Sequence, residues 1–543
     1  MVVVCITWFH SSPVQGKESV LHIGTVNPPT SLNFFGATDL WSGRILRLFH
    51  MPLYVRGPQQ DRPRAWLAAG PPRTVPNGVI IPLRDAKWDD GTPVTAHDLA
   101  FTIGVIQEFR VPGLVEKWED VKGIHVVGPK RIRLVLSHPS PDFFSRALRT
   151  GFVQKRAWQE VIQAARKAED GLRFLLSHHP DHVVSNGPFY LSTDGTPYFL
   201  VLKRNPFFFD PSLDIGGIKD DFSLQGITLL FYRDYRTMVR DFEQGKTDFL
   251  WSDLTEVQGR QLVASPHVVI HRTPRTGYDY LGFNLKKSPF DDLAFRKAVS
   301  LLVDRERIIQ HILKGYAEPV FSVIPPHNTA WHRADIEGLG TDLNAAQRVE
   351  KARATLREAG YGWHQGTLLL PHGSPMAPME ILTTGNGAMA FRSRVVMILK
   401  KELLKIGVRV HPVILNLKAL LAALKEGDFD AYLLGWASLP EDPGYLRTFF
   451  HTREARPGGK NYVRFHDETF DRLMEQASQE MDPDKRKKII YQVQSLLAEK
   501  RPYIPLYAAT RAEATRNDRY RGWVALPGGV GNLWSFLNIK PVH

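Results

Sequence analysis

Short runs rich in β-branched and apolar residues recur along the whole chain and alternate with longer segments of helical periodicity. Runs of this length and composition predict strands, whereas the longer periodic segments predict helices. Repeated alternation of the two predicts an α/β architecture with at least one mixed sheet. The clearest strand-like runs are Val20–Thr25 (VLHIGT), Arg131–Leu136 (RIRLVL), Ile227–Tyr232 (ITLLFY) and Val408–Leu415 (VRVHPVIL).

Two segments carry the strongest helical pattern. The segment Leu293–Lys314 places apolar side chains near helical spacing, and Gly315 follows where a left-handed residue can end a helix. The segment Phe391–Ile406 has the same pattern and stops at Gly407. We therefore expect one helix over each segment. The apolar positions are Ala298, Leu302, Ile309 and Leu313, then Val395, Leu399, Leu403 and Ile406.

Composition excludes some classes of protein. A chain of 543 residues suggests two to four structural units, and its hydrophobic and charged fractions are ordinary for a globular protein. Cys5 is the single cysteine, so an intramolecular disulfide or a cysteine-based zinc site is impossible. The net charge of +13 is dispersed, and no nucleic-acid recognition module is present. We expect no nucleic-acid partner; the positive charge favours solubility or proximity to an anionic membrane surface.

The N-terminus resembles a signal peptide only in part. No apolar run reaches the roughly 18–20 residues of a membrane-spanning helix. The opening MVVVCITWFHSSPVQG is apolar at first but has no basic region before the apolar patch. We treat residues 1–17 as a separate segment, the remnant of a signal peptide. Whether Cys5 carries a lipid, and whether this segment stays in the mature protein, are left open.

The stretch Lys87–Thr102, KWDDGTPVTAHDLAFT, is crowded with residues that could do chemistry. Its spacing favours a scaffold instead. Asp90-Gly91 is a turn dipeptide, and Thr95 with Asp98 fits a capping box at the start of an apolar helical run. Of the polar residues, only Asp89 and His97 lack a local structural role. We therefore expect a turn and a capped helix here.

Two further motifs have weak functional interpretations. GNGAMA (Gly385–Ala390) lies between an apolar strand and a helix, as a dinucleotide fingerprint does, but no acid follows at the distance that binds a ribose. SHHPDH (Ser177–His182) has metal-ligand residue types without a helix to space them. We expect a flexible loop at the first motif, able to line a ligand cleft, and a solvated loop at the second, with no cofactor or metal. Recognised hydrolase and nucleotide-binding motifs are absent from the sequence, which argues against an enzyme.

Several aromatic residues lie beside turn residues rather than within periodic runs. Trp436 is the most informative, because its strand leads into a loop with two acids, Glu441 and Asp442. An aromatic wall near a carboxylate suits an organic ligand that bears an ammonium group. Ordinary core packing is the alternative. The other aromatic residues of this kind are Phe34, Phe35, Trp88, Trp251, Tyr278 and Tyr280.

Taken in order, these segments resemble the family 5 extracellular solute-binding proteins, the peptide- and nickel-binding receptors of bacterial ABC importers. The stretch Lys87–Thr102 resembles the W-x-D-G-x-P-x-T-A-x-D signature of that family. Colinear similarity covers nearly the whole chain from about residue 20. The other matching segments are SNGPFYL (Ser185–Leu191), KRNPFFF (Lys203–Phe209), EQGKTDF (Glu243–Phe249), Tyr280–Ile309, LREAGY (Leu356–Tyr361), KIGVRV (Lys405–Val410), LLGWASLPEDP (Leu433–Pro443) and RPYIPLY (Arg501–Tyr507).

The resemblance implies a two-lobed periplasmic-binding-protein-like α/β fold of type II, with mixed sheets, an extra inserted subdomain and a hinge between the lobes. It places lobe I at residues 18–40, 183–275 and 506–543, the inserted subdomain at 41–182, and lobe II at 276–505. It also implies a binding protein without catalytic residues, cofactor or metal. The expected location is periplasmic, or extracellular and membrane-associated.

The resemblance also implies a set of ligand-binding residues. Trp436, Glu441 and Asp442 match the loop that holds the ligand's α-amine in peptide binders, and Arg394 matches a position that can hold a carboxylate. Gly444 stands where many members have a second acid, so this loop departs from the family's amine-binding pattern. The remaining expected ligand-binding residues are Asn284, Tyr280, Phe34 and Phe35.

The function implied by the resemblance is capture of a small solute, most of all a peptide, and its delivery to a membrane permease by a monomeric receptor. A nickel chelate, a sugar or another non-peptide solute is the alternative within the family. A hydrolase that uses the same cleft is the alternative outside it. The sequence does not identify the ligand or the permease.

Overall fold

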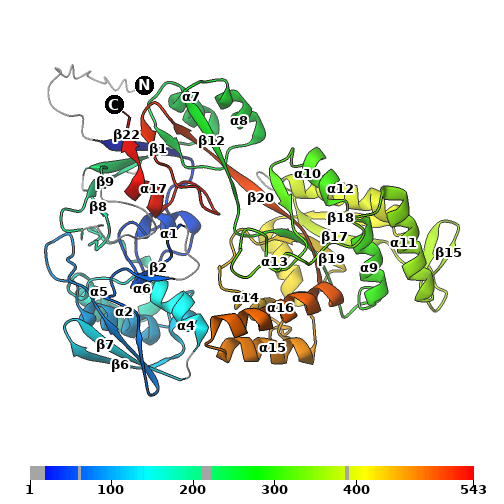
Figure 1. Ribbon diagram of the computed structural model, residues 1–543, viewed down its shortest axis with the longest axis horizontal. Helices are drawn as coiled ribbons and strands as arrows, with labels where there is room; N and C mark the ends of the chain where they lie inside the picture. Colours follow the sequence, from blue (N-terminus) through cyan, green and yellow to red (C-terminus); the bar gives the residue numbers. More distant parts are fainter. Residues whose placement is uncertain are drawn as a thin grey trace.

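One long strand, β20 (Tyr503–Arg516), runs through both bodies of the molecule (Figure 1). The computed structural model describes residues 19–58, 63–137, 140–192, 194, 196, 198–208, 222–385 and 390–542. The first half of β20 pairs with β13 (Asp279–Phe283) and its second half pairs with β12 (Val268–Pro274). Its side chains are buried along nearly the whole strand, as expected for the centre of a large sheet.

The strands on either side of β20 complete one mixed sheet. Their bounds are β1 (Val20–Thr25), β8 (Phe189–Leu191), β9 (Phe199–Arg204), β10 (Gly226–Phe231), β11 (Phe249–Leu250), β14 (Ala317–Pro319), β17 (Met379–Thr384), β18 (Val410–Leu415) and β19 (Ala431–Gly435). The strand order is β18-β17-β19-β13-β20-β11-β1-β10-β9-β8, with β12 and β14 also paired to β20. Strand β10 is parallel to β1 and antiparallel to β9. The mixed sheet predicted from the sequence is therefore confirmed.

Smaller sheets decorate this frame. A four-stranded sheet of order β4-β5-β7-β6 forms the lower part of the body that contains β1 (Figure 1). Its bounds are β4 (Arg73–Val75), β5 (Gly78–Pro82), β6 (Val121–Gly128) and β7 (Arg131–Leu136). Three two-stranded pairs complete the strands: β2 (Tyr54–Val55) with β3 (Arg64–Ala65), β15 (Gly362–His364) with β16 (Thr367–Leu369), and β21 (Tyr520–Arg521) with β22 (Lys540–Pro541).

Helices cover both bodies, which we call lobe I, around β1, and lobe II, around β13 and β19. The helices of lobe I are α1 (Leu40–Leu46), α2 (Ala96–Glu108), α3 (Val115–Trp118), α4 (Pro141–Arg146), η1 (Ala147–Arg149), α5 (Lys155–Lys167), α6 (Gly171–Ser177), α7 (Tyr235–Glu243), α8 (Glu256–Val263) and α17 (Leu533–Asn538). Those of lobe II are α9 (Leu293–Leu302), α10 (Arg305–His311), α11 (Ala345–Glu358), α12 (Ala390–Leu404), α13 (Leu417–Glu426), α14 (Tyr445–Phe450), η3 (Thr452–Glu454), α15 (Glu468–Gln479) and α16 (Pro483–Lys500). Among the described residues, every helix is too short or too polar to span a bilayer.

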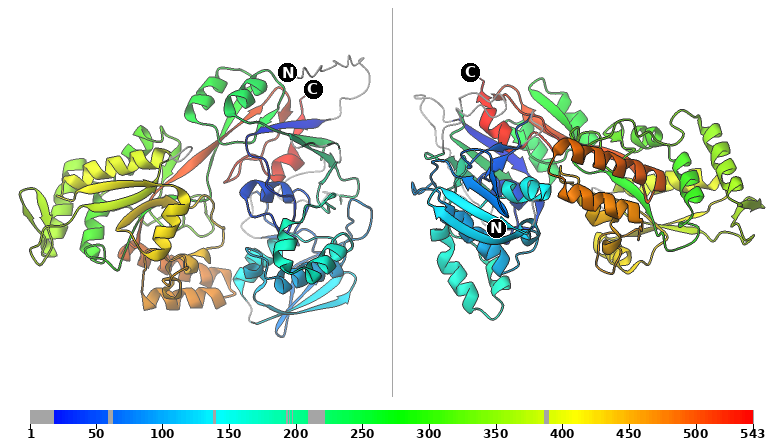
Figure 2. Two further views of the ribbon diagram at one scale, coloured as in Figure 1. Left: turned by 180° about the vertical axis from the view of Figure 1, so that it is seen from behind. Right: turned by 60° about the horizontal axis from the view of Figure 1, so that its bottom comes forward.

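Each lobe has its own hydrophobic core. The largest apolar cluster runs from Leu21 to Ile539 and lies in lobe I, while two others fill lobe II. Figure 2 shows the lobes from behind and from below, with β20 bridging them. A second connection is the segment Arg275–Tyr278 between β12 and β13. The lobe and subdomain boundaries derived from the resemblance stay a prediction, and the one near residue 275 falls on this segment.

The structure corrects one predicted helix and confirms another. The expected single helix over Leu293–Lys314 is two helices, α9 and α10, because Val303 is extended and Asp304 caps α10 by accepting from the Arg307 amide at 2.9 Å. The helix predicted over Phe391–Ile406 matches α12, and Gly407 has φ +82°. Of the GNGAMA motif, residues 386–389 lie outside the described residues.

Candidate ligand-binding site

The Lys87–Thr102 stretch is scaffold, as its spacing predicts. Thr95 and Asp98 form the predicted capping box at the start of α2, with the Asp98 carboxylate accepting from the Thr95 amide at 2.8 Å. The other Asp98 oxygen accepts from the Lys155 amide at 2.9 Å, where α5 begins. One buried carboxylate therefore serves the N-termini of two helices, and α5 was not foreseen as its partner.

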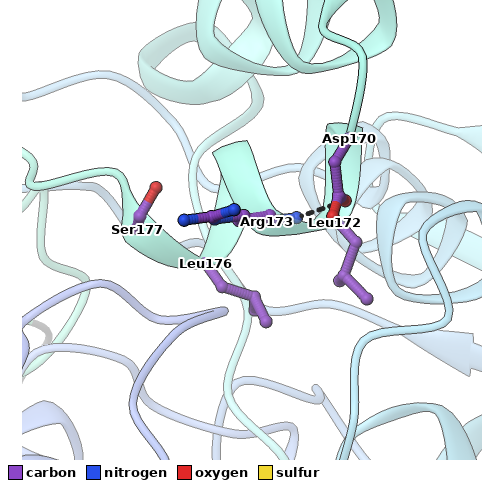
Figure 3. Close-up of a pocket in the computed structure, with 5 residues that line it drawn as sticks. All are labelled: Asp170, Leu172, Arg173, Leu176 and Ser177. Carbon is purple, nitrogen blue, oxygen red and sulfur yellow. Dashed lines mark hydrogen bonds between the residues drawn. The ribbon is translucent and has the colours of Figure 1, made fainter.

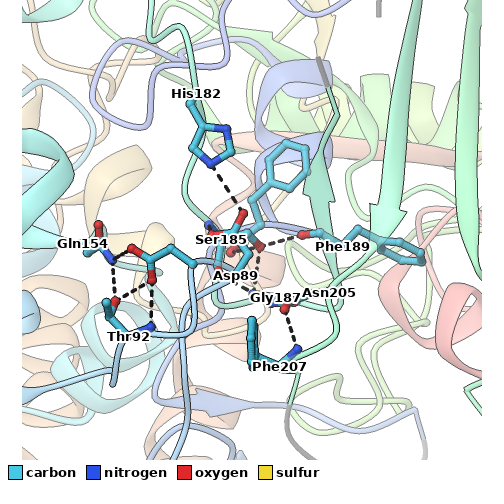
Figure 4. Close-up of polar contacts among 11 residues, drawn as sticks. Asp89, Thr92, Gln154, His182, Ser185, Gly187, Phe189, Asn205 and Phe207 are labelled. Carbon is cyan, nitrogen blue, oxygen red and sulfur yellow. Dashed lines mark hydrogen bonds and ion pairs between the residues drawn. The ribbon is translucent and has the colours of Figure 1, made fainter. Parts of the chain in front are cut away.

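Asp89 also has a structural role that sequence reasoning missed. Its carboxylate accepts from the Ser185 amide at 3.0 Å, and its own amide donates to the Ser185 carbonyl at 2.8 Å (Figure 4). Burial raises the pKa of Asp89, opposed by the Ser185 amide and by His182, whose Nε2 lies 3.6 Å from the carboxylate. Asp89 therefore holds the turn against the segment that follows α6.

The Ser185–Leu191 motif is a hub of backbone contacts rather than a binding loop. The Asn186 side chain accepts from the Met51 amide at 2.7 Å. Asn205 donates to the Gly187 carbonyl at 2.9 Å (Figure 4). A Cβ on Gly187 would lie 2.1 Å from the Leu48 carbonyl oxygen, so only glycine fits there. These two motifs, which carry part of the family resemblance, thus hold lobe I together.

The segment that crosses from lobe I to lobe II is tightly packed. A Cβ on Gly277 would lie 1.7 Å from the Trp436 carbonyl oxygen, and the Trp436 amide donates to the Tyr278 carbonyl at 3.1 Å. The Thr276 and Ser438 hydroxyls are 2.8 Å apart. The loop after β19, which carries Trp436, is therefore anchored directly on one of the two connections between the lobes.

Trp436 belongs to a column of stacked aromatic rings. Its ring lies parallel to Phe449 at 3.9 Å and to Tyr280 at 6.0 Å, and Tyr280 stacks on Tyr503 at 3.9 Å. Tyr280 and Tyr503 are buried, whereas Trp436 is only half-buried. The predicted pair Trp436 and Tyr280 is thus in one place, and of the two only Trp436 keeps some exposure to solvent.

The two acids of this loop have different partners. Asp442 forms a bidentate pair with Arg486 of α16, at 2.6 and 2.8 Å, and both side chains are buried in lobe II. Glu441 instead pairs with Arg56 and, at 3.3 Å, with Arg149, both of which belong to lobe I. Asp442 is therefore neutralised within its own lobe, and Glu441 is an ionic contact between the lobes.

The other predicted site residues lie elsewhere. Arg394 is exposed on α12, while Asn284 is buried and donates to the Gly427 and Phe429 carbonyls at 3.0 Å each. Phe35 is 2% exposed and packs edge-on against Trp158, and Phe34 packs partly buried against the same core. The packing of Phe35 and the hydrogen bonds of Asn284 occupy these side chains within the protein.

Sequence reasoning missed the arginines that surround the predicted residues. Arg392, two positions before Arg394, is buried and donates to the Asp279 carboxylate at 2.5 Å. Burial raises the pKa of Asp279, and the Arg392 charge opposes that shift. Arg56 and Arg149 lie in segments without a recognisable motif, so only the folded chain brings them to Glu441.

Lobe I also has a hollow on its surface, but residues from only one helix line it. Its lining residues, Asp170, Leu172, Arg173, Leu176 and Ser177, all belong to α6 and its N-cap (Figure 3). The Arg173 amide donates to the Asp170 carboxylate as an ordinary helix cap. Because a single short helix lines it, this hollow does not enclose a ligand.

Comparison with known proteins identifies the family. The family model described as "Bacterial extracellular solute-binding proteins, family 5 Middle" matches residues 62–456 of the chain. The oligopeptide-binding protein AppA of Bacillus subtilis is 24% identical over 91% of this chain and 87% of its own length. The fold is that of type II periplasmic binding proteins, which include NikZ of Campylobacter jejuni, solved with Ni(L-His) (TM-score 0.73, 21% identity, 96% and 100% of the two chains covered). A periplasmic oligopeptide-binding protein of Thermotoga maritima has a TM-score of 0.78 at 18% identity, covering 97% of this chain and 100% of that one. The chain belongs to the bacterial extracellular solute-binding proteins of family 5.

Proposed function

We propose that this protein captures a small solute, a peptide in the first instance, between its lobes and delivers it to the membrane permease of an ABC importer. Family membership and similarity to oligopeptide-binding relatives support the peptide. The observation that carries the site is the half-buried face of Trp436, held on the loop that meets both the interlobe segment and lobe I. The receptor acts as a monomer, without turnover, cofactor or nucleic acid.

In the proposed mechanism, the lobes close on the solute by moving about the two connections between them, β20 and Arg275–Tyr278. A solute that contacts both lobes stabilises the closed arrangement by the contacts it makes from both sides. A solute that binds one lobe alone shifts nothing, because its affinity is the same in both arrangements. Trp436 supplies the lobe II contact, and the surface of lobe I opposite Glu441 supplies the other.

The ammonium role of Glu441 and Asp442 is not part of the proposed site. Both carboxylates already hold guanidinium groups, so an ammonium would have to displace Arg486 or the arginines of lobe I. This arrangement favours solutes that are recognised by groups other than an ammonium. It also keeps a non-peptide solute, such as the nickel–histidine complex that NikZ holds, as the second candidate.

A thermal-shift screen of the purified chain tests the proposal. The panel contains di- to pentapeptides, nickel–histidine, oligosaccharides and polyamines. A solute at 100 times its Kd adds about 2.7 kcal/mol to the unfolding free energy, which gives a clear rise in Tm. We expect peptides to raise Tm. A response confined to another class would favour the second candidate, and conversion of a bound compound to product would contradict a receptor.

The Trp436 contact has its own test. Replacing Trp436 by Leu should weaken a peptide identified in the screen by about tenfold or more, since buried aromatic anchors dominate interfaces. Trp363 on the distant β15 hairpin is the matched control, and Trp363→Leu should leave affinity unchanged. Calorimetric titration of both variants decides between them, and equal affinity would remove Trp436 from the site.

A further inference from the structure

Two stretches of chain cross between the lobes side by side. Residues 272–276 end β12 and begin the second connection between the lobes, and residues 508–511 lie in the middle of β20. The Arg275 amide donates to the Ala509 carbonyl at 3.0 Å, so the two stretches are hydrogen-bonded where they cross. We call them the hinge ribbon. Any change in the angle between the lobes bends or twists this ribbon, because the chain passes between the lobes through it.

One face of the hinge ribbon is held by a carboxylate of lobe I. Asp253, which follows β11, lies 2.8 Å from Nη2 of Arg275 and 2.6 Å from Nε of Arg511. These two arginines come from the two stretches of the ribbon, so one side chain ties both of them. Arg511 also lies 3.2 Å from Glu513 and over the ring of Trp41 in α1. This face of the ribbon is therefore the one that faces α1.

Arg275 is the movable partner of Asp253. Arg511 lies in the half of β20 that pairs with β12 of lobe I, and Asp253 belongs to lobe I as well. Arg275 lies just past the end of β12, on the segment that leads into lobe II. The side chains of Arg275 and Asp253 are 31% and 36% exposed, so water can replace each partner when the pair separates.

The opposite face of the hinge ribbon has its own contact between the lobes. Because side chains alternate along a strand, Arg272 lies on the other face from Thr273 and from Arg511, which is opposite Thr273. Arg272 donates to the hydroxyl of Tyr316 at 2.9 Å and lies over its ring at 4.3 Å, and Tyr316 follows α10 of lobe II. Ala512, opposite Arg272, packs with apolar residues of α7 and α8. This face is therefore the one that faces α7 and α8.

The lobes meet again away from the hinge ribbon. Helix α4 of lobe I contacts α15 of lobe II, and Glu441 pairs with Arg149 at 3.3 Å. Figure 1 shows α1 and α4 below β20, and α7 and α8 above it. Bringing α4 and α15 together therefore bends the ribbon towards its α1 face. Such a bend shortens contacts across the α1 face and stretches contacts across the face towards α8.

We infer that the two contacts of the hinge ribbon oppose each other: Asp253 with Arg275 favours the lobes together, and Arg272 with Tyr316 favours the lobes apart. These are positioning residues, because they act on the angle between the lobes and belong to the ribbon rather than to the proposed solute site. Their effect on affinity rests on the proposed capture of a solute between the lobes. A solute that contacts both lobes binds more weakly when the arrangement competent for binding is less populated.

The opposite signs expected for two matched variants test this inference. Arg275→Gln and Arg272→Gln each remove one guanidinium from one face of the ribbon. Pulsed electron paramagnetic resonance, without solute, measures the distance between spin labels at the exposed positions Lys167→Cys in α5 and Lys488→Cys in α16, with Cys5→Ser. We expect Arg275→Gln to raise the ratio of long to short distances by about threefold, and Arg272→Gln to lower it by about threefold, because partly exposed contacts are weak.

Affinity gives a second measurement. The probes are tetra-alanine and nickel–histidine, titrated by calorimetry. For a probe that binds the wild type, Arg275→Gln should weaken binding by up to about threefold and Arg272→Gln should tighten it by a similar factor. Tyr316→Phe keeps the ring beside Arg272 but loses the hydroxyl, so it should tighten binding less. Lys351→Gln removes an exposed charge of α11 and should change neither distances nor affinity. The Tm of each variant shows that it is folded.

The outcomes separate the inference from the proposed function. Unchanged distances in both variants, or shifts of the same sign, would overturn the inference, and binding of a probe would still leave solute capture standing. If the distances shift with opposite signs and neither probe binds the wild type, the opposed contacts stand and capture of these two solutes fails. Shifted distances with unchanged affinity would overturn the coupling between the ribbon and solute binding.

Discussion

Glu441 and Asp442 are neighbours in the chain, yet their surroundings differ completely. The Asp442 side chain is 9% exposed and forms a bidentate pair with Arg486, while that of Glu441 is 34% exposed and reaches the arginines of the other lobe. Arg486 also donates to the Ala477 carbonyl at 2.9 Å and lies over the Trp331 ring. One acid is therefore part of the lobe II core, and the other is an ionic contact between the lobes.

The comparison shows that residue type and position do not determine the role of a carboxylate. Its role follows from the origin of its partner and from its access to water. A buried pair is costly to break because the remaining charge has no solvent, whereas an exposed pair is screened and contributes little. The same distinction orders four expected effects, from large to small.

The largest effect is expected when Asp442 is replaced by Ala. Arg486 would keep its charge in a buried position without a carboxylate, which costs about 3–5 kcal/mol of unfolding free energy. Chemical denaturation monitored by tryptophan fluorescence measures the loss. The double variant Asp442→Ala with Arg486→Met should recover much of it, because the buried charge is gone. Wild-type stability in the single variant would place Asp442 in the same class as Glu441.

His50 extends the comparison to a buried group whose pKa no charged side chain of the described residues shifts. Burial lowers its pKa from 6.5 to about 3, against a weaker opposing hydrogen bond at Phe152. Below pH 6.5 the unfolded chain takes up a proton that folded His50 does not, so its stabilising contribution is complete above that pH and is lost as pH falls towards 3. The loss is about 1.4 kcal/mol per pH unit.

The difference between wild type and His50→Leu isolates this effect from other titrating groups. Denaturation at pH 7.5, 6 and 5 should show a steeper fall in stability for the wild type. Parallel curves would mean that folded His50 accepts a proton as readily as the unfolded chain does.

Asp98 provides an intermediate case, a buried carboxylate whose partners are mainly backbone amides. Replacing it by Ala leaves the amides of Thr95 and Lys155 without an acceptor and should cost about 2 kcal/mol. Asp98→Asn, which keeps an acceptor oxygen, should cost less. Thermal denaturation compares the two, with Asp85→Ala as the control because that side chain is fully exposed. A loss as large as that of Asp442→Ala would show that charge compensation is not what separates the classes.

The smallest effect on stability is expected for Glu441→Gln. Its partners are partly exposed arginines, so solvent screening limits the loss to under about 1 kcal/mol. Small-angle scattering should nevertheless show a more open molecule, because the substitution removes an attraction between the lobes. A loss of several kcal/mol would mean that the interlobe contact is as firmly built as the Asp442 pair.

The sequence predicted local structure far better than it predicted the long-range contacts of the candidate site residues. Strands such as Val20–Thr25 and the capping box at Thr95 depend on patterns within a few residues, and the structure confirms them. The break between α9 and α10 was not predicted, because the apolar pattern continues across Asp304, the residue that caps α10. The partners of Glu441 come from residues nearly three hundred or more positions away, so local pattern contains no trace of them. The sequence also did not show which of two nearby arginines is buried: Arg392 is buried, whereas Arg394 is exposed.

The position of β20 has a consequence for how the chain is made. This central strand pairs with both lobes, yet it comes at residues 503–516 of 543. Because the ribosome delivers the N-terminus first, neither half of the large sheet can be completed until β20 follows the earlier strands of both lobes. The large sheet therefore stays incomplete in both lobes until this one strand arrives, and a single late event of synthesis completes the two lobes together.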